Sequence, residues 1–149
     1  MIVRQSIAGA VLLAGGLLLL AGCGESAAKK EAEEKDHLKI LALQFGKYLG
    51  AHRGAGPANE QQFKDFLKSR KTELAEMQIN DIDALFTSPR DGQPYVIVYG
   101  FKPGPSPSPA GRVIAYEQKG VDGRRFVAFD TTAVQEMDET KFQSVVGKK

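Results

Sequence analysis

The chain has 149 residues, with 20 lysines and arginines against 18 aspartates and glutamates, a formal net charge of +2. This near-neutral balance argues against a nucleic-acid partner, which would need a concentrated basic face. The length fits one domain with a modest hydrophobic core. The single cysteine excludes a disulfide within the chain.

The first segment is an apolar run from Ile7 to Ala21 that follows one basic residue, Arg4. The run is roughly 15 residues long, shorter than the about 20 residues that a transmembrane helix needs. We therefore interpret residues 1–22 as a signal peptide that is removed from the mature protein. A retained membrane anchor is the alternative.

The run ends in Leu20-Ala21-Gly22-Cys23, where two small residues precede the only cysteine. This tetrad closely resembles the lipobox of bacterial lipoproteins. The resemblance implies that signal peptidase II recognises Leu20, Ala21 and Gly22 and cuts before Cys23, whose thiol then carries a diacylglyceryl group. Two acyl chains are enough for stable attachment to a membrane. The alternative interpretation of this segment is an ordinary secretory signal peptide without lipidation.

A glycine, Gly24, follows the cysteine where an aspartate would favour retention in the inner membrane. We therefore expect a lipid-anchored protein of the cell envelope that faces the periplasm or the exterior, with the outer membrane favoured over the inner. Residues 23–35 hold the lipidated cysteine and a charged tether without large apolar side chains. Their opposite charges at helical spacing also permit a frayed helix.

The segment Asp36–Gly50 is predicted to be an amphipathic helix, because apolar residues recur in it at spacings of three and four. The apolar stripe consists of Leu38, Leu41, Ala42, Phe45, Tyr48 and Leu49. Asn59 is the predicted N-cap of a second helix, Glu60–Ser69, with Gln62 completing a weak capping box. The following short and irregular helical stretch should cover the core with Leu74, Met77, Ile79, Ile82, Leu85 and Phe86.

The second half of the chain is predicted to form a sheet, with a turn at Thr87–Pro94 before the first strand and a hairpin turn at Gly120–Gly123. Asp138 should cap a C-terminal helical turn. Helices followed by a meander of strands predict an α+β domain over residues 36–149, with a long N-terminal helix packed on a small antiparallel sheet of three to four strands. The predicted strands are Tyr95–Tyr99, Arg112–Tyr116, Arg125–Phe129 and a possible fourth, Val134–Met137, and Phe129 in the third strand is expected to pack against the long helix.

The connection between the first two strands, Phe101–Gly111, contains four prolines and two glycines. Because proline lacks an amide donor, we expect an exposed, extended loop. Its central part, Lys102–Ala110, is interpreted as a spacer that carries no folding energy. A docking strip for a protein partner is the alternative.

Three stretches resemble the soluble part of bacterial pilin-like proteins, such as the pseudopilins of type II secretion. They are the helix end Phe45–Leu49 with its glycine-rich turn and Pro57, the loop Ser88–Tyr95, and the hairpin segment Gly123–Asp130 followed by Val134. The resemblance implies a pilin-like fold and a structural or assembly role in the cell envelope.

The chain departs from the pilin pattern in two respects. A lipobox and a charged tether stand where pilins have a prepilin peptidase motif and a fully hydrophobic first helix, so we expect a monomer that does not polymerise. Thr131 and Thr132 follow Asp130 where the family has a glycine, so that turn should differ.

The candidate catalytic residues do not form a recognisable pattern. His37 and His52 are 15 positions apart and flank the first predicted helix, too far apart to share a metal. Ser88 lies outside any nucleophile elbow and is interpreted as a turn residue. Gly54–Gly56 is too short for a phosphate-binding loop.

Three carboxylates near the first strand were considered as calcium ligands, since some pseudopilins bind calcium there, but they lack EF-hand spacing and are interpreted as turn and capping residues. They are Asp81, Asp83 and Asp91. We therefore expect a non-enzymatic lipoprotein without metal or cofactor. The alternatives are a lipid-tethered binding module for a small ligand or peptide, which uses the proline-rich loop and the sheet face, and an envelope hydrolase whose residues meet only in the fold.

Overall fold

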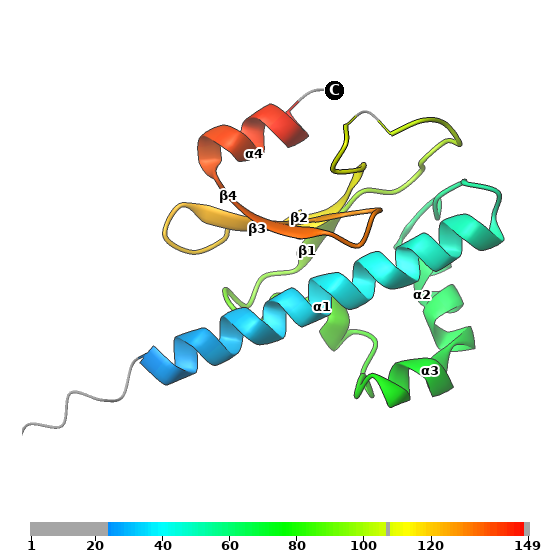
Figure 1. The fold of residues 1–149 in the computed structure, drawn as a ribbon. Coiled ribbons are helices and arrows are strands. Elements are labelled where there is room, and N and C mark those ends of the chain that lie inside the picture. The colour runs from blue at the N-terminus through cyan, green and yellow to red at the C-terminus, as the bar shows by residue number, and fades with distance from the viewer. Residues whose placement is uncertain (1–23, 107, 148–149) are drawn as a thin grey trace, which may run out of the picture.

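The computed structural model describes residues 24–106 and 108–147, and these residues form an α+β domain, as predicted. One long helix lies below a four-stranded sheet and a short helix lies above it (Figure 1). The helices are α1 (Gly24–Ala51), α2 (Glu60–Ser69), α3 (Lys71–Glu76) and α4 (Glu139–Val146), with a 3₁₀ turn, η1 (Ala84–Phe86). The strands are β1 (Tyr95–Ile97), β2 (Val113–Glu117), β3 (Arg124–Phe129) and β4 (Val134–Asp138).

Helix α1 begins at Gly24, so the backbone of the predicted tether is helical from that residue onward. Its buried stripe is the predicted one, and it packs against β2 and β3. The helix ends where Arg53 and Gly54 adopt positive φ angles of 55° and 85°. There the amide of Gly54 donates to the carbonyl of Leu49 at 2.7 Å, which satisfies one of the last helical carbonyls.

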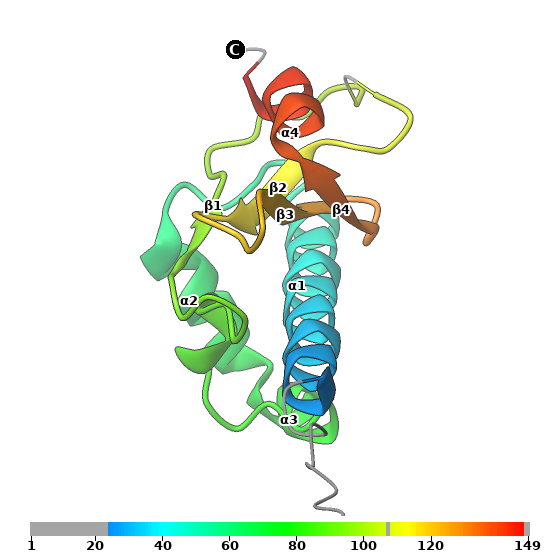
Figure 2. The same cartoon turned by 90° about the vertical axis from the view of Figure 1, so that its left-hand side faces the viewer.

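Helix α2 has the predicted boundaries, and Asn59 is its N-cap, because the Asn59 side chain accepts a hydrogen bond from the amide of Gln62 at 2.9 Å. The predicted capping box is incomplete, since the Gln62 side chain reaches the amide of Ala58. Phe63 and Leu67 are buried against α1. Helix α2 lies to one side of α1 in Figure 2.

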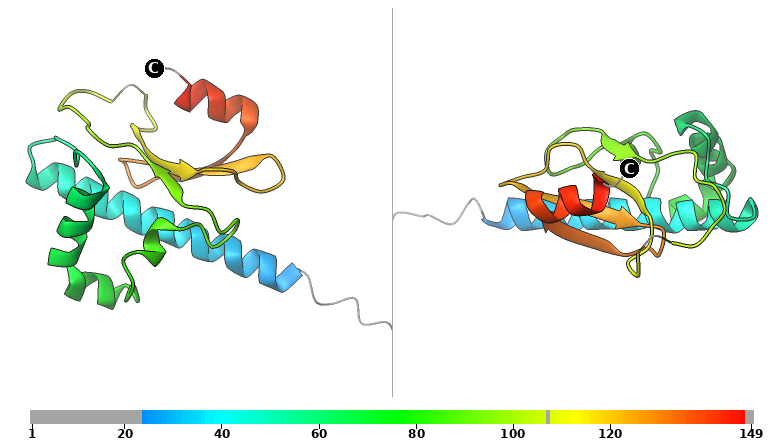
Figure 3. Two further views of the ribbon diagram at one scale, coloured as in Figure 1. Left: turned by 180° about the vertical axis from the view of Figure 1, so that it is seen from behind. Right: turned by 90° about the horizontal axis from the view of Figure 1, so that it is seen from above.

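The sheet is an antiparallel meander of order β1-β2-β3-β4. The fourth predicted strand is present, and β1 is shorter than predicted, since it ends at Ile97. Tyr116 of β2 is opposite Val96 of β1 and Val127 of β3. From above, α4 crosses the sheet on the side opposite to α1 (Figure 3). Asp138 caps α4 as predicted, accepting from the amide of Lys141 at 2.8 Å.

Strand β3 is buried on both faces, which corrects one prediction. Phe126 and Ala128 belong to the cluster around α1, whereas Val127 and Phe129 belong to the cluster around α4. Phe129 was expected to pack against α1, and this is wrong, because successive side chains of a strand point to opposite faces. The continuous apolar run of β3 is typical of a strand covered on both sides.

Candidate functional site

An apolar groove of about 1010 Å³ lies on the sheet face that carries α4. Its floor is formed by side chains of the four strands, and its walls come from α4 and from the proline-rich loop. The residues that line it most directly are Val96, Val98, Val113, Tyr116, Phe129 and Met137 on the sheet, Lys141, Ser144, Val145 and Val146 on α4, and Ser108, Pro109 and Ala110 on the loop.

The groove exists because α4 covers only part of the sheet. α4 packs on β3 and β4, where Phe142 is buried and meets the ring of Tyr116 edge-on at 5.1 Å. The part of the face that belongs to β1 and β2 has no helix over it. Val96 and Val113 on this side are half-buried, and the proline-rich loop borders them in place of a helix.

The proline-rich loop is fixed at both ends. Its residues 102–106 are exposed, as predicted. At its start, the ring of Phe101 packs edge-on against Phe45 at 5.4 Å. At its end, the carbonyl of Ala110 accepts from the hydroxyl of Thr131 at 2.7 Å. The loop is therefore more than a spacer, because its last residues form one wall of the groove.

An ion pair holds this wall against the β3–β4 turn. Asp130 accepts from the Nε of Arg112 at 2.8 Å and from its amide at 2.9 Å, and the Arg112 guanidinium also donates to the carbonyl of Lys102. Gly111 adopts a φ of 107°, and a Cβ there would lie 2.4 Å from a carboxylate oxygen of Asp130. Only glycine fits this close approach without a shift of the backbone.

The charges of the groove are all positive. Its lining contains Arg112 and Lys141 and no aspartate or glutamate. Arg112 is neutralised by Asp130. Lys141 is exposed, and no ion pair joins its ammonium group to another of the described residues. The groove therefore combines a mostly apolar lining with a net positive charge.

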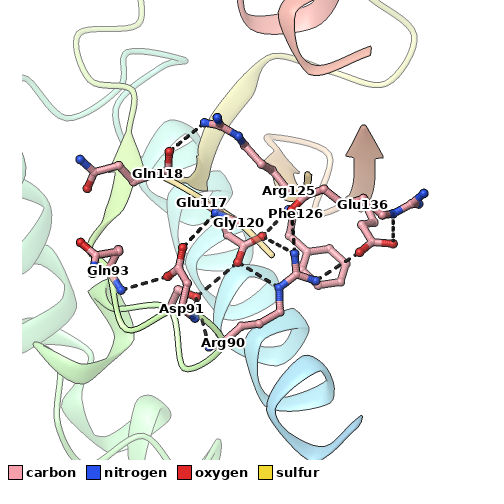
Figure 4. Close-up of polar contacts among 11 residues, drawn as sticks. Arg90, Asp91, Gln93, Glu117, Gln118, Gly120, Arg125, Phe126 and Glu136 are labelled. Atoms are coloured by element: carbon pink, nitrogen blue, oxygen red, sulfur yellow. Dashed lines mark hydrogen bonds and ion pairs between the residues drawn. The ribbon is translucent and has the colours of Figure 1, made fainter. Parts of the chain in front are cut away.

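The predicted turn Thr87–Pro94 carries a separate buried ion cluster (Figure 4). The guanidinium of Arg90 donates to both carboxylate oxygens of Glu117, at 3.2 Å and 2.9 Å, and to Glu136 at 3.2 Å. The same group lies 4.6 Å from the centre of the Phe126 ring. The Glu117 side chain is 0% exposed and the Arg90 side chain 10% exposed, so this pair is almost completely enclosed. The cluster ties the turn to β2, β3 and β4.

Ser88 belongs to this cluster as a turn residue. Its hydroxyl oxygen accepts from the amides of Arg90 and Asp91 and its hydroxyl donates to Glu117 at 3.4 Å. Asp91 has the predicted turn role, because it accepts from the amides of Gln93 and Gly120.

Two carboxylates have pKa values below the ordinary range of glutamate. Burial alone would raise the pKa of Glu136, but hydrogen bonds from Arg90 and Arg124 outweigh it and lower that pKa. Between α3 and α1, hydrogen bonds from Lys47, Gln44 and Arg70 lower the pKa of Glu73 to about 2 despite some desolvation. Both carboxylates are therefore charged at neutral pH and act as structural anions.

The remaining candidate residues do not converge. His37 lies inside α1 and His52 just beyond its end, which separates them by roughly 22 Å along the helix. His52 stacks on Tyr48 with the ring centres 3.9 Å apart. Asp81 accepts from the amide of Asp83, which itself pairs with Lys64 at 2.7 Å. Within the described ranges, three or more metal-ligating side chains do not come together anywhere.

Sequence reasoning named the proline-rich loop and the sheet face but missed the groove between them, and it missed Arg90 and Glu117. A glutamate in the otherwise apolar strand β2 was the one available signal for the buried pair. The predicted lipobox residues Leu20, Ala21, Gly22 and Cys23, and the rest of the signal peptide, lie outside the described residues, as does Pro107.

None of the helices in the described part of the chain combines the length and the apolar character that crossing a membrane requires. Comparisons with protein-family models, with curated proteins and with solved structures return no match.

Proposed function

We propose that the chain is a membrane-anchored, non-enzymatic lipoprotein of the cell envelope that binds a ligand or partner in the apolar groove. The observation that supports the binding role is the groove itself, a concave apolar surface of about 1010 Å³ with a few polar groups at its rim. Ligand sites in proteins typically have this form. The lipobox at Leu20–Cys23 supports the anchored location.

The groove leaves apolar side chains partly in contact with water. Val113, Tyr116, Val145 and Val146 are only partly buried although they adjoin a buried cluster. Each square ångström of apolar surface that a ligand covers contributes about 25 cal/mol. An apolar patch of this kind on a single domain commonly marks an interaction surface.

The groove lies toward the C-terminal end of α1. Gly54 lies against Pro103 and Gly56 against Phe101, at the start of the loop that borders the groove. The N-terminal end of α1, next to the proposed lipid on Cys23, is at the opposite end of the helix (Figure 1). In a lipid-anchored protein, this arrangement directs the groove toward the aqueous side.

A structural or assembly role of the pilin-like kind is the second candidate. The packing of one long helix on an antiparallel meander supports it, together with the turn at Thr87–Pro94 that leads into β1. Such a role needs a protein partner at the membrane, and the groove or the exposed part of Lys102–Ala110 would be the contact surface.

Membrane attachment is tested with Cys23→Ser, which removes the lipid-accepting thiol. We expect the variant to leave the detergent phase and the membrane fraction, whereas the unchanged protein remains in both. A Cys23→Ser protein that is cut before residue 23 and still sediments with membranes would contradict the anchor.

The binding role is tested with Val145→Asp, which puts a charge into the wall of the groove. Val121→Asp in the β2–β3 turn is the matched control, since Val121 is also half-buried and does not line the groove. In cross-linked membranes solubilised with mild detergent, Val145→Asp should lose bound molecules that Val121→Asp retains. Equal recovery from both variants would count against the groove as a binding site.

A further inference from the structure

The central part of the groove floor offers side chains and little free backbone. The floor is formed by all four strands, of which β2 and β3 are the two central ones. The amides and carbonyls of central strands are used in pairing with their neighbours. A ligand on this floor therefore gains apolar contact and finds few hydrogen-bond partners for its own polar groups.

This property disfavours an extended peptide as the occupant. Every peptide residue brings an amide and a carbonyl that lose water on burial and need new partners. Peptides that bind to sheets solve this by pairing with an exposed strand edge, and the groove floor is a face. An aliphatic chain has no such groups. The volume of about 1010 Å³ is at the upper end for ligand pockets, so a long chain can be accommodated.

The charge at the rim of the groove indicates which polar group the ligand carries at the end of its chain. The lining has two cations and no carboxylate, and Asp130 already neutralises Arg112. Lys141 thus supplies the unneutralised positive charge of the lining, on the exposed surface of α4. Ser144 follows three positions later on the same helix, and Ser108 stands on the loop that forms another wall.

We propose that the groove binds a long-chain carboxylate, with its acyl tail on Val113, Phe129 and Val145 and its carboxylate at the ammonium group of Lys141. The proposal rests on the proposed binding role of the groove and names its ligand chemistry. Binding is noncovalent, and the affinity comes mainly from the tail. Each methylene that enters the groove should raise the affinity about fourfold until the groove is filled.

The test uses the full-length protein in its membrane and a hexadecanoate probe with a diazirine near the end of its tail. After irradiation, mass spectrometry should locate the probe on peptides that contain Val113–Glu117 or Glu139–Val146. Competition with unlabelled carboxylates of increasing length should show the fourfold steps. Hexadecanol, which has the same tail and no charge, should compete three- to fivefold less well, as expected for an ion pair at an exposed rim.

Lys141→Met removes the charge and keeps an apolar stem of similar length. It should remove the preference for hexadecanoate over hexadecanol and leave competition by hexadecanol unchanged. Lys119→Met is the matched control, since Lys119 is exposed in the β2–β3 turn and does not line the groove. It should preserve the preference. Both lysines are on the surface, so both variants should fold.

Three results would overturn the proposal, and they separate it from the broader binding role. If hexadecanoate and hexadecanol compete equally well, the groove is an apolar binding site that does not recognise the carboxylate. If an apolar peptide competes more strongly than hexadecanoate, the groove is a binding site for peptides and the proposed ligand class is wrong. Labelling that avoids both groove peptides would reject the groove as a binding site altogether.

Discussion

The two faces of the sheet differ in how completely they are covered. Toward α1 the core is closed, because Phe45, Phe63 and Phe126 are at most 1% exposed and helices surround them. Toward α4 a smaller cluster is buried, and next to it Val113 and Tyr116 remain partly exposed in the groove. The sheet is therefore sealed on the side of α1, whereas on the side of α4 part of its apolar surface remains in contact with water.

The largest loss of stability is expected for a substitution on the closed face of the sheet. Phe45→Ala should lower the free energy of unfolding by about 3–5 kcal/mol, because it leaves a cavity among Phe63, Phe101 and their neighbours. Phe129→Ala on the groove face should cost less, since a groove wall can relax into the space more easily than an enclosed core. Urea denaturation of both variants measures this difference. A loss for Phe129→Ala as large as that for Phe45→Ala would erase the distinction between the faces.

Disrupting the buried ion pair of Arg90 and Glu117 should give the second largest loss of stability. Glu117→Ala leaves the 10%-exposed side chain of Arg90 without its main partner, and losing one member of a buried pair costs about 3 kcal/mol or more. The additional change Arg90→Met should restore much of that loss, because it also removes the buried positive charge that has lost its closest carboxylate. Asp36→Ala is the control: its pair with Lys39 is exposed, so the cost should stay below about 1 kcal/mol. Comparable losses in Glu117→Ala and Asp36→Ala would show that the cluster contributes little.

The smallest expected loss of stability comes from Glu73, and it should depend on pH. The pKa of Glu73 is lowered from 4.5 to about 2 by Lys47, Gln44 and Arg70, so the folded state binds its proton less readily than the unfolded state. Its contribution is therefore complete above about pH 4.5 and disappears as the pH falls toward about 2. At neutral pH, Glu73→Gln should cost about 1 kcal/mol. The difference in denaturation midpoint from the unchanged protein should shrink on acidification, and a constant difference would argue against this coupling of α1 to α3.

Local signals predicted much of the fold from the sequence. Asn59 and Asp138 were identified as N-caps because their side chains act on amides three residues away. The four strands followed from β-branched and aromatic runs. The face on which Phe129 lies could not be predicted in this way, because a strand buried on both sides has no alternation that marks its two faces.

The groove and the ion cluster depend on long-range packing. Arg90 and Glu117 are 27 positions apart, and the sequence between them contains the whole proline-rich loop. The groove results from the short length of α4 relative to the sheet, which no single motif encodes. The predicted lipobox depends instead on a local pattern, because the prediction rests on four consecutive residues, Leu20–Cys23.

The length of α1 has a mechanical consequence. Its 28 residues span about 42 Å as one helix that starts at Gly24, directly after the residue proposed to carry the lipid. An α-helix of this length transmits bending and twisting from end to end much better than a flexible linker does. With a lipid on Cys23, the helix would act as a lever arm. A load applied at the groove would then tilt the whole domain about its attachment point and exert a torque on the membrane.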